Sequence, residues 1–292
     1  MKKPIVSVII PSFNHAKYIQ QTIDSVMMQS YGKNNIQLLV IDDNSTDNSQ
    51  VLLKKLEKIY GFTLFQNNHN KGIVKNINKM LQKAKGKYIA ILGSDDTWEK
   101  IKLDKQVALL EENSNYGAVS ANCIRIDSKG NPLPKKQQRH TKKSTYNFKD
   151  VFLRSHRIVT LNTLIRKSVL AEVGFYNEEF KIEDYYMWLK ITEAGYPIHL
   201  MNEVLGYYRI HESNTINKPL FIYKELRKII DEYKSHKLYR KAYQSLNRVY
   251  FPQLAAVKRI EAIKILPSAI SKTKFFLRGI KYLILPRRMF IK

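Results

Sequence analysis

Several features that mark other protein classes are missing from this sequence. It has one cysteine, Cys123, so no disulfide can form within the chain, and a reducing compartment is the simplest inference. No apolar run approaches the ~20 residues that a transmembrane helix needs. The apolar run at Ile5–Ile10 is too short for a signal-peptide core and ends at Pro11. These absences predict a cytoplasmic protein, attached at most to a membrane surface.

Glycine-rich phosphate loops are also absent. Neither G-x-G-x-x-G nor G-x-x-x-x-G-K-[ST] follows a predicted strand. A nucleotide bound by this chain would lack a glycine cradle. Its phosphates would therefore need a metal ion and basic side chains.

Positive charge, in contrast, is in large excess. Fifty lysines and arginines face 25 aspartates and glutamates, which gives a formal net charge of +25. Such a charge implies an anionic partner: nucleic acid, anionic lipid or a phosphorylated substrate. A basic nucleic-acid-binding protein is one alternative. We expect no nucleic-acid partner, because no helix-turn-helix, zinc-finger or RNP-like signature occurs.

The first hundred residues alternate between strand-like and helix-like patterns. Strands are predicted at 5–10, 38–41, 62–65 and 88–92. Helical spacing of apolar residues follows each of the first three, which predicts a parallel sheet with helices on both faces. After residue 217 the alternation stops and the chain becomes helical and strongly basic. We therefore expect an α/β domain at 1–215 and a helical basic region at 216–292.

Carboxylates follow two of these strands. Asp42 and Asp43 end the second, and Asp95 and Asp96 follow the fourth. Ligands of open α/β sheets bind at the carboxyl ends of the strands. Adjacent carboxylates repel each other unless positive charge lies near, so a hard divalent cation carrying a phosphorylated substrate would suit them. The same residues could instead cap the helices that follow.

These stretches and others further along resemble the family 2 glycosyltransferases, which have the GT-A fold. The matching segments are Val8–Asn14, Val40–Asp47, Asn70–Gly72 with Asn76, Ile91–Asp96, Arg166–Leu170, Val173–Tyr176, Glu183–Asp184 and Tyr208–His211. The resemblance covers residues 1–215. It implies a mixed sheet flanked by helices, and an enzyme that moves a sugar from a nucleotide-diphosphate donor, by expectation a UDP-sugar, to a hydroxyl of a glycan acceptor in bacterial surface polysaccharide biosynthesis.

The resemblance also implies roles at the donor site. Asp43 would recognise the base of the nucleotide, and Pro11 would line the same pocket. Lys75 stands where the family often has arginine, close to the nucleotide. Asp95, with Asp96 beside it, corresponds to the metal-binding carboxylate of the D-x-D signature and would hold Mn²⁺ or Mg²⁺.

The signature is incomplete, because Gly93 stands in the place of its first aspartate. One carboxylate contact is therefore missing, although Asp95 is retained. His211 could help to hold the metal or the diphosphate, and Arg209 could support the phosphates. A single histidine is also often structural.

The resemblance makes Asp184 the general base. It would take the proton of the acceptor hydroxyl while that oxygen attacks the anomeric carbon from the face opposite the leaving group, so that the configuration inverts. Such a role requires hydrogen-bond reach to the acceptor. Glu183 and Asp184 could also simply cap the helix that follows.

The C-terminal region predicts an amphipathic helix from residue 272 to residue 285. Its faces separate apolar residues from basic ones: Phe276, Ile280, Leu283 and Ile284 against Lys274, Arg278 and Lys281. This composition is typical of a helix lying on an anionic membrane, here the inner face of the cell membrane, beside a lipid-linked acceptor. A core-packing helix with a solvated basic face is the alternative.

The acceptor and the activity of the enzyme each allow a second hypothesis. The acceptor could be a protein or a small molecule. The chain could also be a catalytically inactive, sugar-binding relative, as Gly93 suggests. Retention of Asp95 and Asp184 argues against an inactive protein.

Overall fold

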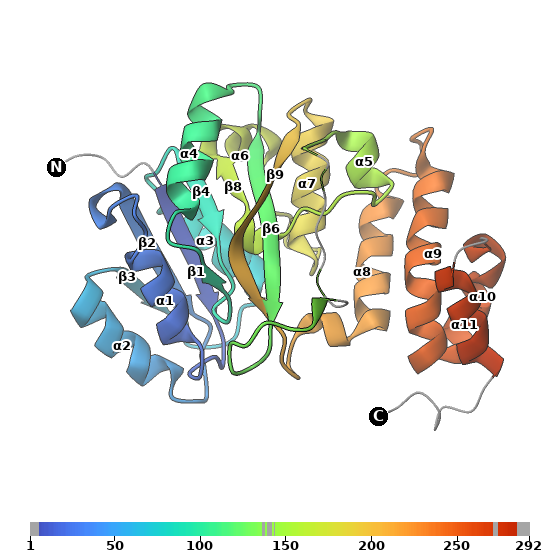
Figure 1. Ribbon diagram of the computed structural model, residues 1–292, viewed down its shortest axis with the longest axis horizontal. Coiled ribbons are helices and arrows are strands. Elements are labelled where there is room, and N and C mark those ends of the chain that lie inside the picture. The colour runs from blue at the N-terminus through green and yellow to red at the C-terminus, as the bar shows by residue number, and fades with distance from the viewer. Residues whose placement is uncertain (1–5, 136–137, 139–141, 143, 271–273, 285–292) are drawn as a thin grey trace. The chain divides into compact units, whose positions relative to one another are not determined.

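The structure is a computed structural model that describes residues 6–135, 138, 142, 144–270 and 274–284 (Figure 1). The basic end of the chain, residues 285–292, lies outside the described residues. The chain divides into two compact units: Met1–Phe148 with Arg157–His211, and Lys149–His156 with Glu212–Lys292. Within the described ranges, every helix is too short or too polar to cross a membrane.

The first unit is built on a mixed sheet. Its strands are β1 (Val6–Ser12), β2 (Ile36–Asp42), β3 (Thr63–Gln66), β4 (Tyr88–Ile91), β5 (Thr97–Trp98), β6 (Ala118–Ile126), β7 (Thr145–Tyr146), β8 (Leu164–Arg166) and β9 (Ile198–Arg209). They follow the order β3-β2-β1-β4-β8-β6-β9-β5, and β7 pairs with β9 (Figure 1). The neighbours β3, β2, β1 and β4 are parallel, as the alternating pattern predicts, whereas β8 runs antiparallel to β4 and β6. The expected mixed α/β sheet is confirmed.

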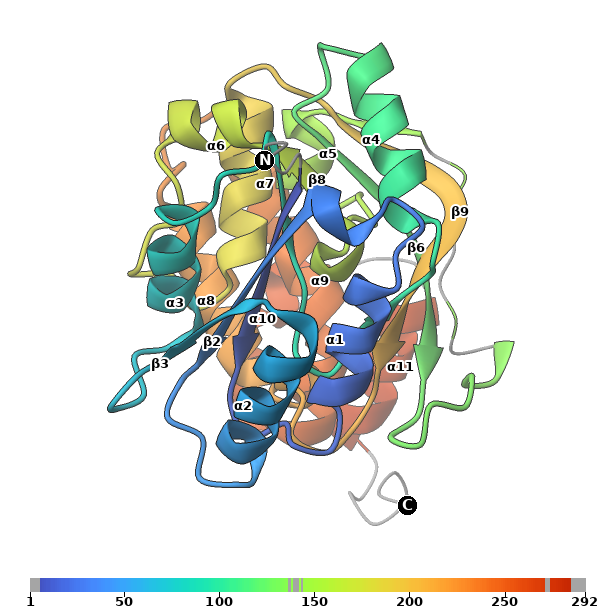
Figure 2. The same cartoon turned by 90° about the vertical axis from the view of Figure 1, so that its left-hand side faces the viewer.

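Helices cover both faces of this sheet (Figure 2). They are α1 (Ile19–Met27), α2 (Ser49–Tyr60), α3 (Ile73–Leu81), α4 (Lys102–Glu112), α6 (Lys167–Val173) and α7 (Glu183–Glu193), with single turns η1 (Lys33–Asn35) and η3 (Thr160–Asn162). The apolar residues of α1, α2 and α4 pack on one face of the sheet. Helix α3 lies on the other face. Each strand–helix unit thus places its connecting loop at the carboxyl end of its strand.

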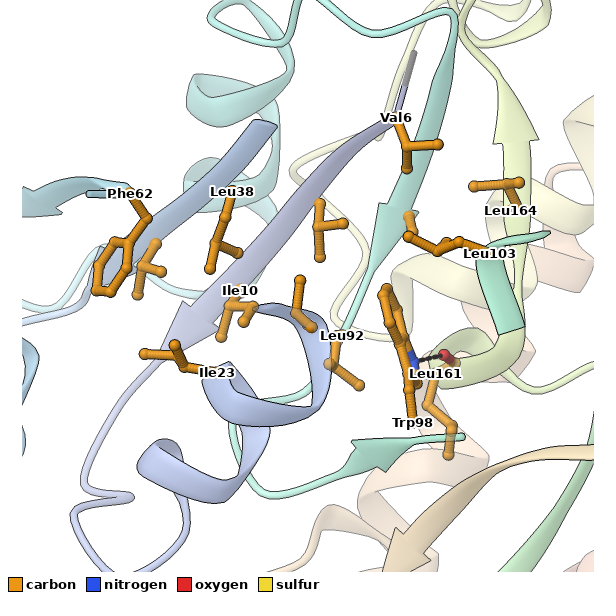
Figure 3. Packing of buried hydrophobic residues seen from close by; sticks show 14 of the residues in the cluster. Val6, Ile10, Ile23, Leu38, Phe62, Leu92, Trp98, Leu103, Leu161 and Leu164 are labelled. Atoms are coloured by element: carbon orange, nitrogen blue, oxygen red, sulfur yellow. Dashed lines mark hydrogen bonds between the residues drawn. The ribbon is translucent and has the colours of Figure 1, made fainter. Parts of the chain in front are cut away.

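Alternation along the strands builds the core on which these loops rest. In β1, every second side chain points to the face of the sheet that carries α1. Ile10 is one of them and lies near Ile23 of that helix (Figure 3). Trp98 is buried in the same cluster, and its Nε1 donates a hydrogen bond to the Leu161 carbonyl at 2.6 Å (Figure 3). Burying each large apolar side chain stabilises the fold by about 1.5–3 kcal/mol. The strand ends are therefore held on a rigid scaffold.

The second unit is helical. It contains α8 (Pro219–Asp231), α9 (Tyr239–Val257), α10 (Arg259–Ala269) and α11 (Lys274–Ile284), preceded by the short turn η4 (Thr215–Asn217). The segment Lys149–His156, which includes most of α5 (Phe148–Phe152), also belongs to this unit. Phe152 is buried there, with its ring centroid 5.2 Å from that of Tyr233. The sequence pattern gives no indication that this early segment joins the C-terminal helices.

Helix α11 forms as the amphipathic pattern predicts, but part of its apolar face is used inside the unit. The Phe276 ring stacks on Phe251 of α9, with centroids 5.3 Å apart. A Cβ at Gly279 would lie 2.5 Å from the Phe251 ring, so glycine permits the close approach. Leu277 and Ile284 remain 62% and 74% exposed. The face is therefore divided between packing and solvent.

Candidate functional site

The loops after β1 and β2 are tied to each other at the carboxyl edge of the sheet. Asn14, in the left-handed conformation at φ +54°, accepts the Thr46 backbone N–H at its Oδ1 (2.8 Å) and donates its own N–H to Ser45 Oγ (2.9 Å). The next backbone N–H, that of His15, bonds to Ser49 Oγ at 3.1 Å. These bonds fix the position of His15 above the strand ends.

Asp43 forms the first polar centre of this edge. Its carboxylate accepts hydrogen bonds from Asn67 Nδ2 (2.9 Å) and from the backbone N–H groups of Lys71 (2.8 Å) and Gly72 (2.9 Å). Burial alone would raise the pKa of Asp43, but these hydrogen bonds outweigh it and lower the pKa. Asp43 is therefore a fixed anion that can accept hydrogen bonds from a ligand.

Two other predicted donor-site residues lie around Asp43. Pro11 is half-buried near the end of β1, one residue before Ser12, whose carbonyl accepts the Asp43 N–H at 2.8 Å. Lys75 is exposed on the first turn of α3, which begins just after Gly72. Among the described residues it makes no hydrogen bond or ion pair, so its ammonium can turn toward a bound anion.

Asp95 forms the second polar centre, with two histidines. His211 Nε2 lies 2.8 Å from Asp95 Oδ2, and both side chains are largely buried, at 8% and 12% exposure. One ligand atom each of His15, Asp95 and His211 lies within 4.8 Å of the other two, close enough to hold a metal ion together. His211 stacks on Tyr18, with ring centroids 5.2 Å apart. Burial lowers the pKa of His15, which favours the neutral ring that binds metals.

Asp96 lies outside this cluster. It is buried, and its Oδ1 accepts the backbone N–H of Arg209 at 2.8 Å. Burial and the neighbouring Asp95 raise its pKa well above the usual range. The hydrogen bond ties the loop after β4 to the end of β9, which delivers His211. Asp96 therefore helps to hold the loop that carries Asp95 in place.

Arg209 is used inside the protein, against the expectation that it supports phosphates. Its guanidinium donates to the Asp95 carbonyl (2.8 Å) and to Gln21 Oε1 (2.8 Å), and it lies over the Tyr18 ring at 4.9 Å. The side chain is 2% exposed. It holds the β4 loop, β9 and α1 together and has no free face for a diphosphate.

Gly93 has little room for a side chain. A Cβ at this position would lie 2.8 Å from Asp95 Oδ1 and 3.4 Å from Asp96 Oδ2. The first distance is too short, so Asp95 Oδ1 would have to shift, whereas the second is an ordinary contact. A larger residue at position 93 would therefore have to displace the Asp95 carboxylate.

Asp184 lies on the first turn of α7. Its Oδ2 accepts the Thr160 hydroxyl at 3.0 Å, and its Oδ1 accepts the Tyr185 N–H at 2.6 Å. Burial and the adjacent Asp184 raise the pKa of Glu183 to about 8. No hydrogen bond or ion pair of the described residues links Asp184 to Asp43 or Asp95. The loops after β1 and β2 are joined by hydrogen bonds, and His15 of the first loop lies in the Asp95 cluster, which connects the two strand-end centres.

Two residues of the site are missed by the sequence analysis. His15 follows the strand-ending segment Pro11–Asn14, and its place after a strand end is the signal that could have identified it. Thr160 begins the turn η3 and belongs to none of the predicted site motifs, so only the fold reveals its contact with Asp184.

Comparison with family models gives one match: residues 7–174 fit the model described as glycosyl transferase family 2. TuaG of Bacillus subtilis, a glycosyltransferase assigned to teichuronic acid biosynthesis, is 32% identical over 237 residues, covering 78% of this chain and 90% of TuaG. The UDP-Glc:alpha-D-GlcNAc-diphosphoundecaprenol beta-1,3-glucosyltransferase WfgD of Escherichia coli is 30% identical over 232 residues, 77% of this chain and 83% of WfgD.

Solved structures share the fold. TarS 1-349 of S. aureus, in complex with UDP-GlcNAc, superposes with a TM-score of 0.67 at 19% identity, covering 95% of this chain and 80% of TarS 1-349. The mannosyltransferase PcManGT of Pyrobaculum calidifontis, with GDP-Man and Mn²⁺, gives a TM-score of 0.64 at 17% identity over 97% of this chain and 86% of PcManGT.

Proposed function

Because this chain belongs to glycosyl transferase family 2 and is a glycosyltransferase of the GT-A fold, we propose that it is a metal-dependent, inverting enzyme of surface polysaccharide biosynthesis. Its donor would be a UDP-sugar and its acceptor a hydroxyl of a lipid-linked glycan. The relative WfgD, whose name gives both a UDP-sugar donor and a diphosphoundecaprenol-linked acceptor, supports this choice. The clustering of His15, Asp95 and His211 at the carboxyl ends of the strands carries the proposal.

The nucleotide would bind at the Asp43 centre. A pyrimidine base offers an N–H to the Asp43 carboxylate, whose low pKa keeps it charged. Pro11 lines the same edge, and Lys75 is free to approach the phosphates. Asp96 would contribute indirectly, by holding the loop that carries Asp95. These residues would select the donor and fix its diphosphate toward Asp95.

The donor atoms of the second centre suit a divalent ion. Asp95 and His211, with His15 beside them, would hold Mn²⁺ or Mg²⁺. When bound, such an ion neutralises the negative charge that develops on the leaving diphosphate. Around it, Tyr18 supports the His211 ring and Arg209 holds the main chain of Asp95.

Asp184 would carry the proton transfer. The acceptor oxygen forms its bond to the anomeric carbon as the bond from that carbon to the diphosphate oxygen breaks. The hydroxyl proton passes to the Asp184 carboxylate, and the nucleoside diphosphate leaves. Thr160 donates to Asp184 Oδ2 and so orients the carboxylate. One displacement from the opposite face inverts the configuration.

A nucleotide panel tests the donor half of this proposal. UDP, GDP, CMP and dTDP, each with and without Mn²⁺, are assayed by thermal shift on the full chain. A ligand at a hundredfold excess over its dissociation constant stabilises the fold by about 2.7 kcal/mol. We expect UDP with Mn²⁺ to give the largest shift. The absence of a shift with every nucleotide would contradict the proposal.

The Asp184→Asn variant tests the base. It keeps the size of the side chain but cannot accept the proton, so transfer should fall by about 10²–10⁴-fold while UDP binding stays intact. Asp104→Asn on the exposed surface of α4 is the matched control and should retain full activity. Transfer by Asp184→Asn at more than half the wild-type rate would exclude Asp184 as the base.

We also propose that the C-terminal helices touch the inner face of the cell membrane, close to the lipid-linked acceptor. Exposed apolar residues stand next to basic ones on α10 and α11: Ile260, Ile263, Leu277 and Ile284 beside Lys264, Arg278 and Lys281. Apolar area and positive charge together favour anionic lipid surfaces. Co-sedimentation with phosphatidylglycerol vesicles, and its absence with phosphatidylcholine vesicles, is the expected result.

A further inference from the structure

The second histidine of the metal cluster has a consequence for which ion the protein takes. We propose that His15 is a direct metal ligand that stands in for the aspartate missing at position 93, and that the resulting two-histidine, one-carboxylate set selects Mn²⁺ over Mg²⁺. This inference rests on the proposed metal dependence of the enzyme.

The spacing of the three side chains fits one ion. Ligand atoms at about 2.1 Å from a common ion lie at most about 4.2 Å from one another. His211 Nε2 and Asp95 Oδ2 are 2.8 Å apart, and the ligand atoms of all three residues lie within 4.8 Å. The three ligand atoms would have to draw together by at most about 0.6 Å to share one ion.

The His15 ring is held in an orientation suited to this role. Its Nδ1 lies 2.7 Å from Ser94 Oγ, and the bond leaves the other ring nitrogen, Nε2, for a ligand. Metal-binding histidines usually have one ring nitrogen fixed by such a partner, which sets the tautomer. The backbone around it is fixed by Ser49 Oγ, bound to the His15 N–H, and by Asp47 Oδ2, bound to the next N–H at 3.0 Å.

The loop after β4 supplies the other half of the argument. A side chain at position 93 would begin 2.8 Å from Asp95 Oδ1, so this backbone cannot offer a second carboxylate from that position without displacing the first. His15 approaches from a different loop, between β1 and α1, and needs no such space. The chain thus offers nitrogen where the D-x-D signature has oxygen.

Replacing oxygen by nitrogen changes ion preference. Mg²⁺ favours oxygen ligands and gives up its water reluctantly. Oxygen ligands suit both Mg²⁺ and Mn²⁺. Mn²⁺, as the transition metal of the two, also takes imidazole nitrogen. Two imidazoles and one carboxylate should therefore favour Mn²⁺ over Mg²⁺ even when oxygen atoms from the two phosphates of a nucleotide are also available.

The test counts nitrogen ligands directly. Electron spin-echo envelope modulation of Mn²⁺ bound to the full chain, with and without UDP, detects coordinated ¹⁴N. Wild-type protein should show two imidazoles, and both His15→Ala and His15→Gln should show one. Titration calorimetry should give at least a tenfold loss of Mn²⁺ affinity in both variants, with Mg²⁺ affinity little changed. His69→Ala removes an exposed histidine outside the cluster and should behave as wild type.

The outcomes separate the two proposals. Unchanged nitrogen modulation, or an unchanged ratio of Mn²⁺ to Mg²⁺ affinity, in a folded His15 variant would overturn the role of His15 alone. Failure of the wild-type protein to bind either ion, with or without UDP, would overturn both this inference and the metal dependence on which it rests. Circular dichroism shows whether each variant is folded. If His15→Ala is unfolded, the test rests on His15→Gln, whose side chain can still bond to Ser94.

Discussion

The ends of β2 and β4 each carry two adjacent aspartates, but the surroundings of the two pairs differ. At the end of β2, Asp43 is surrounded by hydrogen-bond donors, and its pKa is lowered. At the end of β4, burial and the neighbouring Asp95 raise the pKa of Asp96. Hydrogen bonds alone stabilise the charged form of Asp43. At the end of β4, added positive charge would stabilise the charged forms of Asp95 and Asp96.

One member of each pair is structural. Asp42 accepts the N–H and the hydroxyl of Ser45 and so shapes the β2 loop. Asp96 accepts the Arg209 N–H and so joins the β4 loop to β9. The other member, Asp43 or Asp95, is the one to which we assign a ligand. Under the proposed function, a motif of two aspartates would therefore give one ligand-binding group and one scaffold group, and the local donors would decide what the first group binds.

Asp95→Ala should give the largest effect, because it removes the carboxylate from the centre that needs the ion. We expect transfer to fall by about 10²–10³-fold or more, with UDP affinity in the absence of metal unchanged. Steady-state kinetics with Mn²⁺ and calorimetry with UDP alone measure the two quantities. An active Asp95→Ala enzyme would show that the two strand ends do not divide ion and nucleotide between them.

Asp43→Asn should give the next largest effect, and this effect should fall on nucleotide binding instead of metal binding. Loss of a charged hydrogen bond costs about 1.5–3 kcal/mol, so UDP affinity should fall by roughly 10–100-fold. Mn²⁺ binding by the protein alone should be unchanged. Calorimetry on the same preparation gives both values. A joint loss of metal and nucleotide binding would mean that the two centres act as one.

Gly93→Ala sharpens the comparison at the β4 end. The added methyl group would lie 2.8 Å from Asp95 Oδ1 and must displace it. We expect Mn²⁺ affinity to fall by about tenfold, less than in Asp95→Ala, and UDP affinity without metal to remain. Improved Mn²⁺ binding in Gly93→Ala would contradict the close packing of the two carboxylates around Gly93.

Asp96→Asn should give the smallest effect. The amide oxygen can still accept the Arg209 N–H, so transfer and melting temperature should change little. Asp96→Ala leaves that N–H without a partner, which costs about 1–3 kcal/mol. Comparison of the two melting temperatures measures the scaffold role. Loss of Mn²⁺ binding in Asp96→Asn would instead make Asp96 a ligand.

Periodicity in the sequence predicts much of the fold, because its strands are buried on both faces and its helices are amphipathic. The strands at 5–10, 38–41 and 88–92 correspond to β1, β2 and β4, each within two residues at either end. The order of β8, β6 and β9 could not be predicted. It depends on pairings between distant segments, such as Ala118 with both Ile165 and Ile198, which local patterns do not encode.

The site is predicted in part. Motif order identifies Asp43, Asp95 and His211, and the structure groups Asp95 with His211. Motif order does not reveal that Arg209 is buried, because an arginine beside a predicted phosphate site has the same appearance whether it faces ligand or core. His15 escapes notice for a related reason. Its role depends on the turn at Asn14, which brings one strand-end loop over another.

The segment Lys149–His156 bears on the order in which the chain can fold during synthesis. It leaves the ribosome before residues 157–211, yet Phe152 is buried against Tyr233, which emerges later. Until Tyr233 is synthesised, the apolar side chain of Phe152 lacks this partner, although the sheet-forming segments on both sides of it have already been made. A truncation after residue 215 would keep it in that condition permanently, so the helical unit is no simple appendage that can be removed or exchanged at a single cut.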